Sequence, residues 1–385
     1  MAPNTLRIGQ FADSYPPVIN GVSAFVHEHH SELLARGVDA HVFTFGYTWH
    51  RRAGEMRNVW RTFGVPLGAS PFRANLDIDW RAQQAARALH VLHVHEPFGI
   101  GWIAGRVQAR RRHIPLVFTV HTRHDLYIPN WPRLMQRWMN WQAGRTIATF
   151  IRQSQVTTAP SSDTVRWLQA LAPDQASKLR VIRNGIRLDH FDSMPIVARE
   201  ALGVANGDPV FIYVGRLTPE KNLGTLLDAF VSAVQQGAQA HLWIVGDGER
   251  RAELEKRAQS ANGRVRFFGA LSRQIVPSHL RAANVFVTAS LSEANPVSVI
   301  EALAAGLPYA GIDSAWWREF EPTPPAAQAG LLAKTPAELA GLICRMAADP
   351  HLRAMLGAGA KSLSRRFDIR DVTSQWLEIY QSVII

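Results

Sequence analysis

Cysteine, long apolar runs and, in its first half, lysine are scarce in this 385-residue sequence. The single cysteine, Cys344, cannot form an internal disulfide, so the sequence fits a reducing compartment. No apolar run approaches the ~18–20 residues that a membrane-spanning helix requires, and the longest, such as Ile114–Val120, have the length of a strand. The start, Met1–Arg7, lacks the charged and then apolar layout of a signal peptide. We therefore expect a cytoplasmic protein that lies, at most, peripherally on the cytoplasmic face of a membrane.

The basic charge is confined to one half of the chain. Residues 1–190 contain 23 Lys and Arg against 12 Asp and Glu, and 22 of those cations are arginine. Residues 191–385 contain 19 of each sign, so the formal net charge of +11 lies entirely in the first half. An arginine-rich genome would explain the choice of arginine over lysine but not this asymmetry. The asymmetry indicates an anionic partner for the first half: nucleic acid, a phosphorylated substrate or an anionic membrane.

Short β-branched and aliphatic runs alternate with amphipathic stretches along the whole chain, which predicts an α/β fold with parallel sheets covered on both faces. Two successive sets of such runs predict two doubly wound domains. The expected strands are Leu6–Phe11, Ala40–Phe45, His90–His95, Leu116–Val120 and Val156–Ala159, followed by Val210–Val214, His241–Val245, Val265–Phe267, Val285–Thr288 and Pro308–Gly311. We place the domains at residues 1–190 and 191–366, with a C-terminal helix over 367–385 that can pack on either.

Two glutamates stand eight residues apart in the second half. Glu293 lies on an expected turn, and Glu301 lies inside an apolar helix that Pro296 begins and Gly306 ends. A carboxylate embedded in an apolar helix needs hydrogen-bond donors, and the two hydroxyls of a ribose would supply them. One such glutamate alone would more simply be a surface residue; the pair in this context indicates a ligand site.

Two cations, Arg216 and Lys221, follow the strand Val210–Val214 and precede a helix. Open α/β sheets bind ligands at the carboxyl ends of their strands, and two cations beside a helix N-terminus suit a diphosphate. Read alone, they could equally be two solvated surface cations. Gly246 ends the next strand and would admit close backbone approach, although the sequence there lacks a full dinucleotide-binding fingerprint.

In the first half, Gly21 lies between the first strand and its helix, where backbone N–H groups can approach an anion. His121 ends a strand at the sheet edge, a common place for catalytic groups. The nearby His90, His93 and His95 could suggest a metal site. They have no cysteine partner and no His-Glu helix pattern, so we predict that no metal is bound there.

Taken together, these residues resemble the retaining glycosyltransferases of group 1, or family 4, which have the GT-B fold of two Rossmann-like domains facing across a cleft. The family's Glu-x7-Glu motif matches Glu293 and Glu301. The resemblance spans nearly the whole chain through further short segments: FADSYPPVINGV at 11–22, HVHEP at 93–97, TVHT at 119–122, APS at 159–161, VIRNG at 181–185, VGRLTPEKN at 214–222 and GDG at 246–248. Each segment is weak alone, but their order and spacing together are specific.

The resemblance implies a role for each matching residue. Arg216 and Lys221 would hold the donor diphosphate and stabilise the departing charge in place of a metal, so no cofactor is expected beside the nucleotide sugar. Glu301 would bind the ribose and Glu293 the sugar hydroxyls. His121 would lie beside the sugar. The remaining donor-binding positions would be Gly21, Gly246 and Asn295. It also implies an α-linked product from an α-linked donor, with the departing phosphate accepting the acceptor's proton.

The sequence departs from the family pattern at two places. Ala315 and Trp316 replace a usual glycine pair, so we expect bulky Trp316 and Trp317 to narrow the donor or acceptor pocket. Between the glutamates, Pro296 lacks an N–H and removes one backbone contact. Both departures concern the identity of the sugar.

The opening motif around Asn20 and Gly21 most resembles lipid-glycosylating members, such as diacylglycerol glucosyltransferases and phosphatidylinositol mannosyltransferases. A stripe at helical spacing combines apolar residues with arginines, which suits the surface of an anionic bilayer, although it could simply be core. The stripe comprises Trp131, Leu134, Met135, Trp138 and Met139, with Arg133, Arg137 and Arg145 interleaved, and Arg110, Arg111 and Arg112 add a basic cluster. We predict hexose transfer from UDP-glucose, UDP-galactose or GDP-mannose to a membrane lipid.

Other functions are consistent with parts of the sequence. A transferase of this fold could act on a soluble or polysaccharide-precursor acceptor, and an epimerase of the same fold would convert the donor without any acceptor. A nucleic-acid-binding protein would explain the arginine but needs base-binding motifs that do not occur, so no nucleic-acid partner is expected. A nicotinamide dehydrogenase would need a glycine fingerprint that Gly9–Gly21 does not supply.

Overall fold

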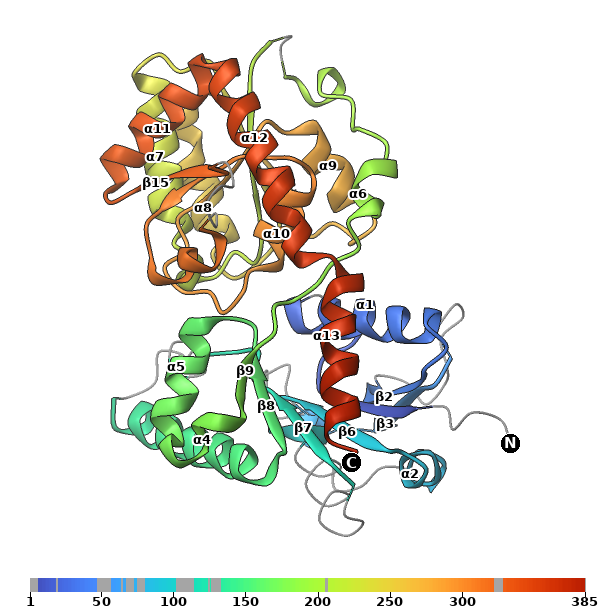
Figure 1. The fold of residues 1–385 in the computed structure, drawn as a ribbon. Helices are drawn as coiled ribbons and strands as arrows, with labels where there is room; N and C mark the ends of the chain where they lie inside the picture. The colour runs from blue at the N-terminus through green and yellow to red at the C-terminus, as the bar shows by residue number, and fades with distance from the viewer. Residues whose placement is uncertain are drawn as a thin grey trace. The chain divides into compact units, whose positions relative to one another are not determined.

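The computed structural model describes residues 6–18, 20–46, 57–63, 65–66, 73–74, 80–101, 114–123, 125, 133–204, 207–321 and 328–384 (Figure 1). The chain divides into two compact units. One comprises Met1–Gly185 with Ile369–Ile385, and the other comprises Ile186–Asp368. The division falls five residues before the boundary expected at 190. The C-terminal segment belongs to the N-terminal unit, which is one of the two placements left open by the sequence.

The N-terminal unit is built on a parallel seven-stranded sheet with the order β3-β2-β1-β6-β7-β8-β9. The strands are β1 Arg7–Ala12, β2 Asp39–Gly46, β3 Val59–Phe63, β6 Val91–His95, β7 Leu116–Thr119, β8 Val156–Ala159 and β9 Leu179–Val181; β4 Val65–Pro66 and β5 Arg73–Ala74 form a separate antiparallel pair. Five of the seven strands match the predicted ones within one or two residues at each end. The strand order reverses between β1 and β6, which makes their carboxyl ends the expected ligand position.

The helices of this unit cover both faces of its sheet. Their bounds are α1 Gly21–Ala35, α2 Trp80–Arg87, α4 Arg133–Gln153, α5 Ser162–Leu171 and α13 Ile369–Ser382, with the 3-10 turn η3 at Pro173–Lys178. Asn20 caps α1, because its side chain accepts a hydrogen bond from the N–H of Ser23 at 2.8 Å. The last helix, α13, lies beside α1 and buries Trp376 and Tyr380 completely (Figure 1).

The second unit is built on a parallel six-stranded sheet with the order β12-β11-β10-β13-β14-β15. The strands are β10 Val210–Val214, β11 His241–Val245, β12 Val265–Gly269, β13 Val285–Thr288, β14 Tyr309–Ile312 and β15 Gly330–Ala333. Three of them, β10, β11 and β13, have the predicted bounds. The order reverses between β10 and β13, so the carboxyl ends of these two strands form the second expected ligand position.

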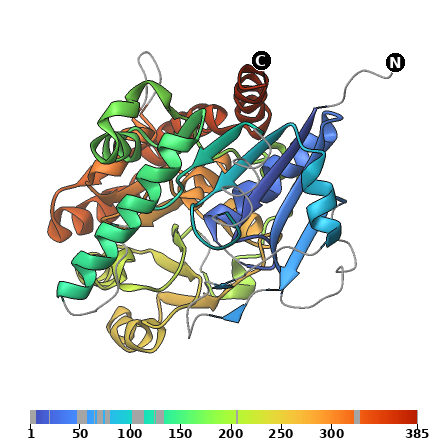
Figure 2. The ribbon, with the colours of Figure 1, turned by 90° about the horizontal axis from the view of Figure 1, so that it is seen from below.

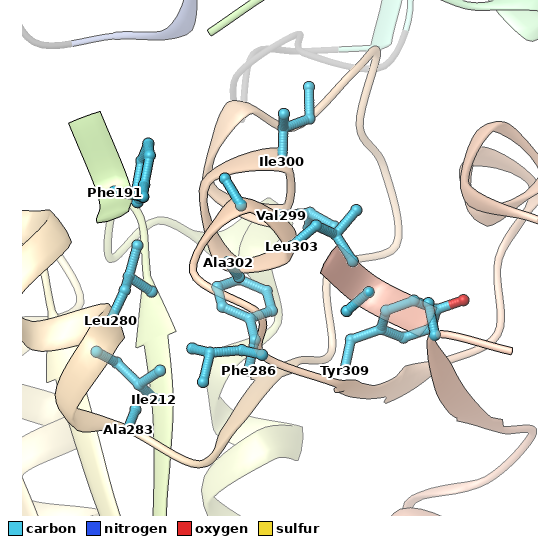
Figure 3. Packing of buried hydrophobic residues seen from close by; sticks show 14 of the residues in the cluster. Phe191, Ile212, Leu280, Ala283, Phe286, Val299, Ile300, Ala302, Leu303 and Tyr309 are labelled. Carbon is cyan, nitrogen blue, oxygen red and sulfur yellow. The ribbon is translucent and has the colours of Figure 1, made fainter. Parts of the chain in front are cut away.

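Helices cover this sheet on both faces as well. They are α6 Asp189–Ser193, α7 Leu223–Gln235, α8 Arg251–Ala258, α9 Val276–Ala282, α10 Val297–Ala304, α11 Pro336–Ala348 and α12 Pro350–Ser364, with 3-10 turns η4 Glu200–Leu202, η5 Pro219–Lys221, η6 Gln259–Ala261, η7 Ala315–Phe320 and η8 Arg365–Phe367. Figure 3 shows how α10 is held: its apolar side faces Phe286 of β13 and Tyr309 of β14. Gly306 follows with φ +78°, a left-handed conformation that ends the helix where the sequence predicts.

Candidate active site

Lys221 and Glu293 meet at the point where the strand order of the second sheet reverses. Lys221 lies in η5 after β10, and Glu293 lies in the loop after β13. The Nζ of Lys221 is 2.6 Å from Oε1 of Glu293, and their side chains are only 11% and 14% exposed. Ser290 donates its hydroxyl to the same oxygen at 2.8 Å. The structure thus brings the predicted cation and the predicted sugar-binding carboxylate into one largely dehydrated ion pair.

The loops that hold this pair are joined by one side-chain hydrogen bond and by one close approach of their backbones. Asn222 follows Lys221 in the left-handed conformation, at φ 51°, and its side-chain Nδ2 donates to the carbonyl of Ala289 at 3.3 Å. Gly246 has φ +141°, and a Cβ there would lie 1.8 Å from the carbonyl oxygen of Gly215. The close approach expected at Gly246 is therefore made by the neighbouring loop of the protein itself. Its contact with the donor stays a prediction.

Arg216 is the more accessible of the two predicted phosphate-binding cations. Its side chain is half exposed and pairs with Glu220 at 3.1 Å. Thr218 donates its hydroxyl to the same Glu220 oxygen at 2.7 Å. Glu220 therefore holds both the loop and the guanidinium, whereas Lys221 is held by Glu293. The two cations differ in burial and in partner, a distinction that the sequence does not reveal.

Glu301 lies on α10 among buried apolar neighbours. Its side chain is 14% exposed, and Nε of Arg273 lies 4.0 Å from its Oε1. Val299, Ile300, Ala302 and Leu303, the neighbours of Glu301 on this helix, are buried (Figure 3). The carboxylate of Glu301 is therefore as little exposed as that of Glu293, in the apolar helix that the sequence predicts, and its binding of a ribose stays a prediction. Arg273 was not identified from the sequence, because it lies 28 positions from Glu301 in a loop without a motif.

Trp316 and Trp317 do not narrow a pocket. Both lie in η7 and are buried in the core of the second unit, where Trp317 stacks on Tyr309 with ring centroids 4.4 Å apart. The indole N–H of Trp316 donates to the carbonyl of Ser290 at 3.0 Å, and that of Trp317 donates to Ile312 at 2.9 Å. The expectation from the sequence is wrong, because the loop turns its indoles back onto the sheet. Through Ser290, Trp316 instead supports the loop that holds Glu293. Asn295, in the same loop, is buried.

In the N-terminal unit, the loops after β1 and β6 are joined by Asp13. Its Oδ1 accepts a hydrogen bond from the N–H of Ile100 at 2.8 Å. Burial, aided by the nearby charge of Glu96, raises the pKa of the Asp13 carboxyl to about 8. Gly21 is the first residue of α1, so its backbone lies at a helix N-terminus, as the anion-binding role requires.

His121 lies just after β7, at the carboxyl edge of the first sheet. Its Nε2 is 3.0 Å from Nδ1 of His95, the last residue of β6, and its backbone N–H donates to Oε1 of Glu96 at 2.8 Å. Burial lowers the pKa of His121 to about 4, against the opposing effects of Glu96 and Asn184. His121 is therefore a neutral imidazole at physiological pH, fixed on two sides.

His93, two residues earlier on β6, has both ring nitrogens engaged. Its Nδ1 is 2.7 Å from the hydroxyl of Tyr380 on α13, and its Nε2 is 2.7 Å from Oγ1 of Thr119. His29 of α1 also reaches the Tyr380 hydroxyl, at 3.0 Å. These rings therefore fasten α13 to the sheet. In the described part of the chain, no group of three or more His, Cys, Asp or Glu side chains is arranged for a metal ion.

Of the residues predicted for membrane or acceptor contact, Trp138 lies on α4 with 56% of its surface exposed. Arg110, Arg111, Arg112 and Trp131 lie outside the described residues. Leu134 is 82% exposed and Trp141 is 53% exposed, whereas Ile147 and Phe150, further along α4, are buried. The alternative that the stripe is simply core is therefore wrong for the first half of this helix.

Comparison with known proteins gives the family. A profile described as "Glycosyl transferases group 1" matches residues 197–363, and one described as "Glycosyltransferase Family 4" matches residues 19–190. The chain belongs to the family 4 glycosyltransferases. Family and GT-B fold are thus confirmed, and with them a glycosyltransferase that draws on a nucleotide sugar.

The curated relatives include enzymes whose names specify a lipid product or acceptor. The chain is 27% identical over 322 residues to an alpha-monoglucosyldiacylglycerol synthase of Acholeplasma laidlawii, and the aligned region covers 79% of each chain. It is 24% identical to a phosphatidyl-myo-inositol mannosyltransferase of Mycobacterium leprae, over 76% of this chain and 73% of that one. Among solved structures, HepE of Anabaena with UDP and glucose superposes with a TM-score of 0.73 at 20% identity, over 98% of this chain and all of HepE. At that identity, the likeness shows the fold.

Proposed function

We propose that this glycosyltransferase moves a hexose from UDP-glucose, UDP-galactose or GDP-mannose to a membrane glycerolipid or glycolipid, without a metal and with retention of the α-configuration. The observation that supports transfer is the pair of Lys221 and Glu293 at the reversal point of the second sheet. The pair places a cation for a diphosphate beside a carboxylate for sugar hydroxyls. The relatives whose names specify a lipid product or acceptor support a lipid acceptor. One is named for glucose and the other for mannose, so they do not decide which hexose this enzyme transfers.

In the proposed reaction, the bond between the sugar's C1 and the phosphate oxygen breaks, and a bond between C1 and an acceptor hydroxyl oxygen forms. The departing phosphate takes the acceptor's proton. Lys221 and Arg216 stabilise the negative charge that grows on the diphosphate, and preorganised cations in a water-poor site are the largest usual contribution to such catalysis. Glu301 holds the ribose. The backbone of Gly21 contacts the phosphates and His121 lies beside the sugar, as the family resemblance implies.

Charge distribution supports an anionic bilayer as the source of the acceptor. Between Glu96 and Asp163 the only acidic residue is Asp125, whereas nine arginines lie in that interval. On α4, Leu134, Trp138 and Trp141 share one helix face by their spacing. The guanidinium of Arg145 lies 4.7 Å from the ring centroid of Trp141. Exposed indoles flanked by arginine favour the headgroup region of anionic lipids. No helix in the described ranges is both long and apolar enough to cross a bilayer.

We expect radiolabel from UDP-glucose, UDP-galactose or GDP-mannose to enter the chloroform-soluble fraction when purified protein is incubated with extracted membrane lipids, with and without EDTA. The Glu301→Ala variant is the control for the donor site, and its affinity for the nucleotide should fall. Label confined to water-soluble glycosides would overturn the lipid acceptor and leave a transferase with a soluble acceptor. Conversion of the nucleotide sugar without any acceptor would instead indicate an epimerase.

We expect α4 to determine vesicle binding. Burying a large apolar side chain is worth roughly 1.5–3 kcal/mol, so the double variant Trp138→Ser/Trp141→Ser should bind phosphatidylglycerol vesicles at least about tenfold more weakly. The matched control is Trp80→Ser on α2, because Trp80 is 68% exposed in the same unit. Co-sedimentation at low and high salt measures both effects. If the two variants bound the vesicles equally well, the proposal that α4 contacts the membrane would be wrong.

A further inference from the structure

The loop after β13 is held from both sides by the loops of the neighbouring strands. In the second sheet, β13 lies between β10 and β14. From the β10 side, Nδ2 of Asn222 donates to the carbonyl of Ala289 at 3.3 Å. From the β14 side, the indole N–H of Trp316 donates to the carbonyl of the next residue, Ser290, at 3.0 Å. Two consecutive carbonyls of this loop are thus fixed from opposite directions.

An aromatic stack fixes Trp316 in turn. Its ring centroid lies 4.0 Å from that of Trp317, and the Trp317 ring stacks on Tyr309 of β14 at 4.4 Å, with interplanar angles of 27° and 22°. All three side chains are at most 5% exposed. A Cβ at Gly311 would lie 2.7 Å from Cζ2 of Trp317, so a side chain there would displace the indole. Because a buried, stacked ring has a defined orientation, the Trp316 N–H reaches Ser290 in a fixed direction.

Ser290 connects this stack to the carboxylate of Glu293. Ser290 is 1% exposed, and its hydroxyl has one proton to donate. Oε1 of Glu293, at 2.8 Å, is closer to that hydroxyl than the carbonyl of Ser292, at 3.4 Å. The Nζ of Lys221 lies 2.6 Å from the same Oε1. Among the described residues, both donors to this carboxylate therefore use Oε1, and Oε2 keeps its accepting capacity.

We infer that Ser290 and Trp316 are positioning residues, which hold Oε1 of Glu293 on Lys221 and leave Oε2 to accept the hydroxyls of the donor sugar. The inference rests on the proposed function, in which Glu293 binds the sugar and Lys221 the diphosphate. A carboxylate that turned away would break two hydrogen bonds, so the sugar meets an acceptor in a fixed place, and less freedom is lost on binding. Trp316 replaces a glycine of the family pattern, and glycine has no side-chain donor. This support for the loop is therefore a feature of this chain.

The two indoles provide a matched pair of variants. Trp316→Phe and Trp317→Phe each remove one indole N–H from a carbonyl, that of Ser290 or that of Ile312, and each keeps a ring in the stack. We expect Trp316→Phe to lower kcat/KM for the nucleotide sugar by about 10–100-fold and Trp317→Phe to leave it within roughly threefold of wild type. Thermal unfolding should show a similar loss of stability in both. An equal loss of kcat/KM in both would show a packing role and overturn the inference.

Binding of the nucleotide with and without its hexose gives a readout that lost packing would not change. In Ser290→Ala, calorimetry should show an affinity for the nucleotide sugar that is lower by about tenfold or more. The affinity for the free nucleotide, UDP or GDP, should stay within roughly threefold, since it has no hexose hydroxyl for Oε2. Ser290→Thr keeps the hydroxyl and should recover most of the loss. Equal losses for both ligands would contradict the assignment of Oε2 to the sugar.

The double variant Ser290→Ala/Trp316→Phe shows whether the two residues act through the same carboxylate. Its kcat/KM should be close to that of the lower single variant, because residues in one chain of contacts are not additive. A loss equal to the product of the two single losses would contradict this chain of contacts. If the wild-type protein neither binds nor turns over UDP-glucose, UDP-galactose or GDP-mannose, the proposed function fails. An active wild-type protein with equally impaired tryptophan variants would instead refute the positioning alone.

Discussion

Replacing Lys221 by methionine should lower turnover of the nucleotide sugar by about 10²–10³-fold, because one preorganised group facing the departing charge typically contributes that much. Lys221 is only 11% exposed, so its ammonium acts with little screening by water. Methionine has a similar length and no charge. The measurement is the rate of nucleotide release at saturating donor, with the KM for the donor recorded separately. Arg216, half exposed and paired with Glu220, cannot replace it from the same position.

The same substitution should also destabilise the second unit, and this effect must be separated from catalysis. Without Lys221, the Glu293 carboxylate is left with Ser290 and without its ammonium, and breaking a largely buried pair costs about 3 kcal/mol or more. The double variant Lys221→Met/Glu293→Gln removes both charges and keeps an acceptor for Ser290. We expect its free energy of unfolding to return toward the wild-type value while turnover stays low.

A surface cation in the same unit provides the matched control. Arg257 pairs with Asp228 on the exposed side of α8 and is 42% exposed. Its replacement by methionine should change the free energy of unfolding by less than about 1 kcal/mol and leave turnover within roughly twofold of wild type. Recovery of turnover together with stability in the double variant would show that the ion pair serves folding alone.

The central strands and the edge strand β12 could be predicted from the sequence, whereas the other edge strands could not. The strands β10, β11 and β13 are buried on both faces, so their sequences are continuous apolar runs with clear limits. Of the undetected strands, β3, β9 and β15 lie at the edge of a sheet, and the two-residue β4 and β5 form a separate pair. An edge strand is short and partly exposed, as in the three-residue β9, and leaves too weak a pattern. The central strands alone were enough to predict that the site residues lie at the carboxyl ends of the strands.

Side-chain partners were less accessible to prediction than the residues themselves. The position of Lys221 and Glu293 after neighbouring strands follows from chain order, but their direct contact depends on loops that Asn222 and Trp316 hold. An indole side chain can line a pocket or pack in a core. Which of the two applies to Trp316 depends on the path of η7, which the sequence does not reveal. His93 and Tyr380 are 287 residues apart in sequence, and no local pattern indicates their hydrogen bond.

Mild acid should destabilise the N-terminal unit strongly. Five of its histidines are buried with lowered pKa values, and desolvation by burial is the main cause for each; they are His29 at about 3, His30 and His121 at about 4, and His93 and His95 well below 6.5. Such groups stay neutral in the folded state, whereas the unfolded chain binds protons as the pH falls through 6.5. Their contribution to stability is therefore fully present above that pH and is lost below it.

The size of the effect follows from linkage. Between pH 7.5 and 5.5, each of these histidines contributes a loss of about 1.3 kcal/mol, or roughly 6–7 kcal/mol for all five. Asp13 opposes it, because its raised pKa of about 8 makes the folded state bind a proton in the same range, which restores roughly 2–3 kcal/mol. The expected net loss of about 4 kcal/mol is a large fraction of the stability of a typical domain.

Urea unfolding followed by circular dichroism at pH 7.5, 6.5 and 5.5 tests this expectation. His29 donates or accepts hydrogen bonds with Thr373 and Tyr380 of α13, so His29→Gln should weaken the fold at pH 7.5 yet reduce its dependence on pH by about one proton. His351→Gln, at an exposed position of α12 in the other unit, should change the free energy of unfolding at pH 7.5 by less than about 0.5 kcal/mol. Because the histidines fasten α13 to α1 and to the sheet, proteolysis at pH 5.5 should release the C-terminal helix first. A free energy of unfolding that is constant from pH 7.5 to 5.5 would mean that these rings are not held neutral by burial.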